Sequence, residues 1–187
     1  VWLVGGESGV GKSRLIEEFR TQALVEGWDV IRGQAITGGM PFQLWQNIIY
    51  RLALTVELTP LEAGVLHIIA PQLDPLLGQE IQPPPTLEDK ATQQRLISTL
   101  VDILCRQEQP TLLILEDLHW AHDSLSPLVT LLRVIQKHRL IVVGTYRDDE
   151  QPHLAEKLSG AQLIKLNRLD SEAITELSQS ILGSQIG

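Results

Sequence analysis

The sequence has one cysteine, no long apolar run and no excess of basic residues. Cys105 stands alone among 187 residues, so an internal disulfide is excluded, and its place on the apolar face of a predicted helix indicates a packed thiol. No uninterrupted apolar stretch approaches the ~20 residues that a membrane-spanning helix needs, and no signal peptide precedes the first predicted strand. We therefore expect no membrane association and a cytoplasmic location.

The shortage of basic residues limits the possible partners. Lysine and arginine together number 15 against 23 acidic residues, which gives a formal net charge of −8. Surfaces that bind nucleic acid usually carry clustered positive charge. We therefore expect no direct nucleic-acid contact by this segment, while a basic domain elsewhere in a longer protein stays open.

The length and the hydrophobic content fit one α/β domain. With 43% hydrophobic residues, 187 residues can bury a substantial core. We interpret residues 1–187 as a single domain in which residues 55–90, with three consecutive prolines at 83–85, form a variable helical and linker region. Val1 already lies in a predicted core strand, which leads us to expect a piece of a longer polypeptide.

Predicted strands and helices alternate along the chain. Apolar runs predict strands at residues 1–4, 28–32, 111–115, 140–144 and 162–166. Helical spacing predicts helices after the first strand, at 42–54, at 61–69, at 86–106 with Thr86 as cap, after a cap at Asp123, and after a cap at Asp170. This alternation predicts a mainly parallel five-stranded sheet covered on both faces.

A glycine-rich stretch, GGESGVGKSRL at residues 5–15, directly follows the first predicted strand. Gly6, Gly11, Lys12 and Ser13 match the phosphate-binding loop known as Walker A. Glycines let successive backbone N–H groups face a phosphate, and the following helix adds the positive end of its dipole. We expect Lys12 to reach the β- and γ-phosphates and Ser13 to bind Mg²⁺. The alternative is a glycine-rich turn that binds no ligand.

Two adjacent carboxylates, Glu116 and Asp117, follow the apolar strand 111–115. Open α/β sheets hold their ligands at this end of the strands. One acid would hold Mg²⁺ together with Ser13, and the other would orient or deprotonate the attacking water. The residues leave open which acid does which, and the alternative is that both acids mark only the exposed end of a strand.

Two further groups near the predicted strand ends have alternative interpretations. Arg147 follows the strand 140–144 and could contact the γ-phosphate, or it could be a surface arginine paired with Asp148 or Asp149. His119 and His122 have the three-residue spacing of metal ligands on a helix. Two histidines without a further ligand do not favour a zinc site.

Three segments in this order, GESGVGKSRL, LLILEDLHWAHDSL and IVVGTYRDDE, resemble the nucleotide-binding domain of the signal-transduction ATPases with numerous domains. This family is a branch of the AAA-like P-loop ATPases, and the resemblance extends from residue 1 to about residue 182, weakest at 55–90. It implies a three-layer P-loop NTPase fold with strand order 5-1-4-3-2. By motif position, the implied phosphate loop is Gly6, Glu7, Ser8, Gly9, Val10, Gly11, Lys12 and Ser13 with Arg14 following, the metal and catalytic acids are Glu116 and Asp117, His119 and Trp120 extend that motif, and Arg147 is the sensor arginine.

The function that the resemblance implies is an ATP-binding, slowly hydrolysing switch that uses ATP or ADP with Mg²⁺. Family members join this domain to kinase, cyclase, DNA-binding or repeat modules, and a nucleotide-dependent oligomer is compatible with it. The sequence departs from the family at Glu116 and at His122, where aspartate is usual. An ADP-holding interaction platform is therefore an open alternative. A small-molecule kinase is a weaker one, because adjacent acids on an interior strand suit water activation.

Overall fold

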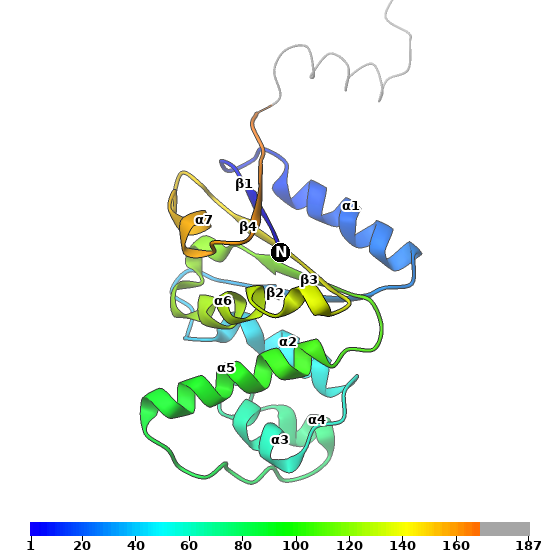
Figure 1. Ribbon diagram of the computed structural model, residues 1–187, viewed down its shortest axis with the longest axis vertical. Helices are drawn as coiled ribbons and strands as arrows, with labels where there is room; N and C mark the ends of the chain where they lie inside the picture. The colour runs from blue at the N-terminus through cyan, green and yellow to red at the C-terminus, as the bar shows by residue number, and fades with distance from the viewer. Residues whose placement is uncertain (169–187) are drawn as a thin grey trace, which may run out of the picture.

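The computed structural model describes residues 1–168, which are organised around a five-stranded parallel sheet (Figure 1). The strands are β1 (Trp2–Gly5), β2 (Asp29–Gln34), β3 (Thr111–Glu116), β4 (Leu140–Tyr146) and β5 (Gln162–Lys165), and every pairing is parallel. Their order is β2-β3-β4-β1-β5, which is the expected 5-1-4-3-2 counted from the opposite edge. The predicted α/β class and strand order are confirmed.

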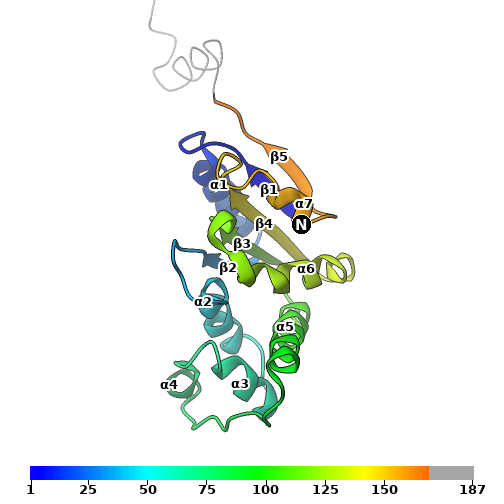
Figure 2. The same cartoon turned by 90° about the vertical axis from the view of Figure 1, so that its left-hand side faces the viewer.

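The helices cover the two faces of the sheet unequally. One face carries α1 (Lys12–Val25), while α2 (Gln43–Ala53), α5 (Asp89–Cys105) and α6 (Ser126–Leu132) lie on the other (Figure 2). Beyond α2 and α5, away from the sheet, lie α3 (Pro60–His67) and α4 (Leu73–Leu77), and the short α7 (Leu154–Lys157) precedes β5. No helix among residues 1–168 has the length and apolar character needed to cross a membrane.

Several predicted helix boundaries are wrong. Helix α5 begins at Asp89 after Glu88, without a side-chain cap, so Thr86 does not cap it. Asp123 lies inside the 3-10 helix His122–Leu125 and does not cap α6, whose first turn contains Pro127. Helices α4 and α7 are too short to give a clear helical period and were not predicted. The helix expected after Asp170 lies outside the described residues.

The central strand β3 is buried along its whole length, as its apolar run predicted. Leu113 and Leu115 pack with α2, α5 and α6 in the larger core, whereas Leu112 and Ile114 pack beneath α1. Cys105 is half-buried against the larger core, and burial raises the pKa of its thiol, so it remains neutral as a packed side chain. Burial on both faces fixes β3 and therefore the acids that follow it.

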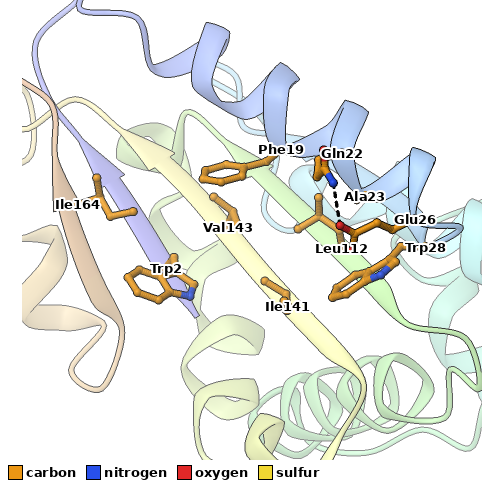
Figure 3. Close-up of a pocket in the computed structure, with 10 residues that line it drawn as sticks. All are labelled: Trp2, Phe19, Gln22, Ala23, Glu26, Trp28, Leu112, Ile141, Val143 and Ile164. Atoms are coloured by element: carbon orange, nitrogen blue, oxygen red, sulfur yellow. Dashed lines mark hydrogen bonds between the residues drawn. The ribbon is translucent and has the colours of Figure 1, made fainter.

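The face under α1 remains partly open. A groove of about 380 Å³ runs between α1 and the strands β4, β1 and β5 (Figure 3). Trp2 and Phe19 are each 41% exposed in it, and Gln22 and Glu26, joined by a 2.7 Å hydrogen bond, lie along its polar side. Phe19, predicted on the inward face of the first helix, therefore borders this groove instead of a closed core.

Residues 55–90 contain α3 and α4 followed by irregular chain through the three prolines. The start of α3 is fixed by a capping box, in which Thr59 Oγ1 accepts from Glu62 N at 3.3 Å and Glu62 Oε2 accepts from Thr59 N at 2.9 Å. Glu62 also pairs with Arg106 at 2.8 Å, just beyond α5. Burial favours the neutral carboxyl, but the Thr59 hydrogen bonds and Arg106 outweigh it and lower the pKa of Glu62.

We expect Glu62→Gln to destabilise the fold by roughly 0.5–1 kcal/mol at pH 7, because it removes one charge of the Arg106 pair while keeping the cap. A lowered carboxyl pKa contributes stability above its unfolded value of about 4.3 and loses it as the pH falls through the folded value. Urea unfolding of both proteins should therefore show a gap that closes below about pH 4. The exposed Glu57→Gln serves as control, and an equal gap at acid pH would contradict the assignment.

Candidate functional site

The loop between β1 and α1 has a backbone that requires glycine. Gly9 and Gly11 have φ angles of 81° and 102°, in the left-handed region that side chains rarely adopt. Lys12, the first residue of α1, folds back over the loop, and its Nζ donates to the carbonyl oxygens of Gly6 and Glu7 at 2.7 Å each. The ammonium group is thereby held beside the loop at the positive end of the helix dipole.

Gly6 brings the loop against the end of β5. A Cβ at this position would lie 2.5 Å from the carbonyl oxygen of Leu166 and 2.9 Å from Cγ2 of Val10. The Leu166 amide also donates to the Gly5 carbonyl at 2.8 Å, which fixes the backbone that a methyl group would have to displace. The close approach therefore has no room for a side chain.

We expect Gly6→Ala to lower the free energy of unfolding by roughly 1–3 kcal/mol, the usual cost of inserting a group into a packed site. Ser8→Ala is the control, because Ser8 is exposed in the same loop. Thermal unfolding measures both, and equal melting temperatures would contradict the close approach.

A cavity of about 260 Å³ brings residues of the three sequence motifs together. Its lining consists of Ser8, Gly9, Gly11, Lys12, Ser13, Arg14, Asp117 and Arg147. Strand β4 lies between β1 and β3, so the loop and the acids come from strands that are not adjacent. Of the other residues expected in the site, Glu7 and Val10 line a neighbouring cavity, Gly6 lies beneath Lys12, and Glu116 lies outside the cavity lining.

Asp117 is fixed at the edge of this cavity by the strand ends on either side. Its backbone is left-handed, with φ 56°, and its amide donates to Thr145 Oγ1 at 3.2 Å, at the end of β4. Gln34, the last residue of β2, donates from Nε2 to Asp117 Oδ2 at 2.9 Å. Sequence reasoning missed Gln34, because only the register of β2 on β3, which pairs Gln34 with Glu116, brings it to the site.

Glu116 has different partners from Asp117. It is only 6% exposed, and its carboxylate accepts a hydrogen bond from Arg32 Nε on β2. Arg32 also donates to Glu17 of α1 at 2.9 Å, so the three side chains form a chain on the α1 face. The hydrogen bond to Glu116 is the first cause of the raised pKa of Arg32. The two adjacent acids are therefore separated, one in an ion pair and one at the cavity.

Arg147 lies at the cavity and is paired, but not with the acids expected. Its Nη1 donates to Glu150 Oε1 at 2.6 Å. Asp148, one of the two expected partners, instead pairs with Lys165 at 3.2 Å. The guanidinium group is thus both an ion-pair partner and part of the cavity wall.

The cavity lining contains three cationic side chains, Lys12, Arg14 and Arg147, and one acid, Asp117. Burial is the first cause that lowers the pKa of Lys12, and Arg147 lowers it further, whereas Asp148, Asp149 and Asp117 raise it. Two neighbouring cations repel each other and gain from an anion placed between them. The electrostatics therefore favour an anionic ligand such as phosphate.

The oxygen ligands at the cavity fit Mg²⁺. Within residues 1–168, no group of three or more His, Cys, Asp or Glu side chains is placed to hold a metal ion. Mg²⁺ bound with a nucleotide needs only one or two protein oxygens, since phosphates and water complete its shell. Ser13 and Asp117 line the cavity, and their hydroxyl and carboxylate oxygens would be of this kind. Of the two histidines considered above as metal ligands, His119 accepts a hydrogen bond at Nδ1 from the backbone amide of Arg147 at 3.3 Å.

Comparison with known proteins gives one family. No curated protein matches this sequence. The model of the AAA ATPase domain matches residues 1–143, which include β1, the glycine-rich loop, β3 with its two acids, and the first part of β4. Because this match covers well over half of the 187 residues, the chain belongs to the AAA ATPase domain family.

Proposed function

We propose that this domain binds ATP with Mg²⁺, hydrolyses it slowly, and acts as the switch module of a multidomain regulatory protein. The observation that carries the proposal is the shared cavity of Lys12, Asp117 and Arg147, which come from three separate parts of the chain. A phosphate chain needs cations and backbone amides on one side and a carboxylate for metal and water on the other. Both are present.

The binding residues we assign to the phosphates are Gly6, Glu7, Ser8, Gly9, Val10, Gly11, Lys12, Ser13 and Arg14. Lys12 would exchange its bonds with the Gly6 and Glu7 carbonyls for phosphate oxygens. Ser13 and an acidic residue would hold Mg²⁺, which neutralises phosphate charge when bound. Arg147 would contact the γ-phosphate.

The two acids have unequal roles in this proposal. Asp117 faces the cavity, so we assign it to the metal and the attacking water. Glu116 is held by Arg32 on the α1 face, and it would reach the metal or the water only after that ion pair opens. Both remain proposed site residues, with Asp117 as the principal acid.

The switch would act on flanking modules of a longer cytoplasmic protein, in the way the family resemblance suggests. A switch needs a conformation that depends on the γ-phosphate. Arg147 lines the cavity and is the first residue of the connection from β4 to α7, so a contact with the γ-phosphate would act directly on that connection. Nucleotide-dependent assembly would be one readout of such a change.

A second candidate is a platform that retains ADP and hardly turns over. The Arg32–Glu116 ion pair favours it, because an acid neutralised by an arginine is a poor base and a poor metal ligand. Both candidates require the same binding cavity. They differ only in hydrolysis.

One experiment on the full-length protein separates the candidates. After nucleotide is stripped, binding of radiolabelled ATP with and without Mg²⁺ is measured together with steady-state phosphate release. Mg²⁺-dependent binding with slow phosphate release supports the switch, and retained ADP without release supports the platform. A protein that binds neither nucleotide would remove the proposed function.

A further inference from the structure

Arg147 contacts three residues that the phosphate site does not include, two through its side chain and one through its backbone amide. Its Nη1 donates to Glu150 at 2.6 Å, its Cζ lies 5.5 Å from the centre of the Trp120 ring, and its backbone amide donates to His119. A cation over an aromatic face and a charge-assisted hydrogen bond both restrict the guanidinium group. The side chain is therefore oriented before any ligand arrives.

Glu150 connects these contacts. While Oε1 accepts from Arg147, Oε2 accepts from Trp120 Nε1 at 3.2 Å. The same oxygen lies 3.7 Å from His119 Nε2, a fully buried ring nitrogen that has no hydrogen-bond partner among the described residues. Because His119 Nδ1 accepts from an amide, Nε2 carries the proton and presents it on the side of Glu150.

Glu150 remains charged in this arrangement. The hydrogen bond from Arg147 is the first cause that lowers the pKa of Glu150, and His119 and Trp120 act in the same direction. One carboxylate thus joins Arg147 to two aromatic residues of the 3-10 helix Leu118–Trp120, which directly follows Asp117. Glu150, the last residue of the segment IVVGTYRDDE, therefore links Arg147 to the residues that follow the acidic motif.

The arrangement would act on one end of a nucleotide bound in the cavity. Arg147 and Lys12 both line the cavity, and the charge of Arg147 lowers the pKa of Lys12, after burial. A restrained arginine loses less side-chain entropy when it binds phosphate than a free one. The gain applies only to the phosphate group that Arg147 reaches.

We propose that Glu150, together with Trp120, is a positioning residue that orients Arg147 toward the γ-phosphate and thereby sets the preference for ATP over ADP. This assignment rests on the proposed nucleotide-binding function. The two side chains of the ion pair are 32% and 37% exposed, so the pair by itself adds little to stability. Its effect should appear in nucleotide discrimination rather than in the melting temperature.

The test compares ATP and ADP dissociation constants, with Mg²⁺, in the full chain. We expect Glu150→Gln to lower the ratio of ATP affinity to ADP affinity on the order of three- to tenfold, a typical coupling between contacting side chains. Glu156→Gln is the matched control, because Glu156 is an exposed acid in a similar pair with His153 at 3.1 Å. It should leave the ratio unchanged.

A double-mutant cycle distinguishes positioning from a general effect of charge. In an Arg147→Ala background, Glu150→Gln should change the ratio no further, because the residue it acts through is gone. A ratio that is unchanged in the single variant, that rises, or that falls equally in both backgrounds overturns the assignment while ATP binding stands. A wild type that binds neither nucleotide overturns the proposed function and this assignment together.

Discussion

Replacing Lys12 by alanine is expected to reduce the affinity for Mg²⁺-ATP by at least about 100-fold. Hydrogen bonds to charged groups are each worth roughly 1.5–3 kcal/mol, and a factor of ten corresponds to about 1.4 kcal/mol. The Lys12 ammonium makes two 2.7 Å hydrogen bonds to the loop carbonyls and lines the cavity, so it lies where it could contact a bound phosphate. Equilibrium binding of radiolabelled ATP measures the effect.

The control for Lys12→Ala is Lys90→Ala, because Lys90 is an exposed lysine on the distant helix α5. It removes the same charge from the molecule without touching the cavity. Thermal unfolding of both variants verifies that the Lys12 variant is folded. Equal ATP affinity in the wild type and in folded Lys12→Ala would exclude the cavity as the nucleotide site.

Replacing Asp117 by asparagine is expected to lower phosphate release about 10²- to 10⁴-fold, the range of a lost general base. The side-chain oxygen of asparagine can still accept a hydrogen bond from Gln34. The backbone amide of residue 117 can still donate to Thr145, so the local geometry is kept. The carboxylate charge is lost, which removes both proton acceptance and a metal ligand. Steady-state phosphate release at saturating ATP is the measurement, with ATP affinity measured in parallel.

Two further variants test whether the loss of phosphate release arises at the cavity. Asp102→Asn removes an exposed carboxylate from α5 and should leave turnover unchanged. Glu116→Gln should reduce turnover less than Asp117→Asn, because Glu116 is held by Arg32 outside the cavity lining. A larger loss in Glu116→Gln would identify Glu116 as the working acid. A wild type without turnover would favour the platform.

Much of the fold could be predicted because local patterns matched the tertiary environment. The unbroken apolar run at 111–115 predicted a doubly covered strand, and β3 is buried throughout. The cap predictions at Thr86 and Asp123 failed because nearby residues start those turns without a side-chain cap. Residues 55–90 showed little helical periodicity. Helices α3 and α4 pack against other helices, so the positions of their apolar residues depend on those contacts.

The sequence identified several residues that line the cavity, but not the side chains that these residues contact. The spacing of Gly6, Gly11, Lys12 and Ser13 is a local requirement of a phosphate loop and can be read from the sequence. Gln34 and Glu150 carry no such pattern, and neither does the pairing of Arg32 with Glu116. These contacts depend on strand order and register, which are long-range properties.

The sequence by itself determined that this chain has an α/β fold with a glycine-rich loop, an acidic strand end and an arginine directly after a third strand, because each feature depends on a few consecutive residues. The tertiary structure decided which of the two adjacent acids faces the cavity. Strand β2 pairs with β3 so that Arg32 meets Glu116, while Gln34 meets Asp117. Neighbouring side chains at a strand end point to different sides, and only the elements packed on each side fix their partners.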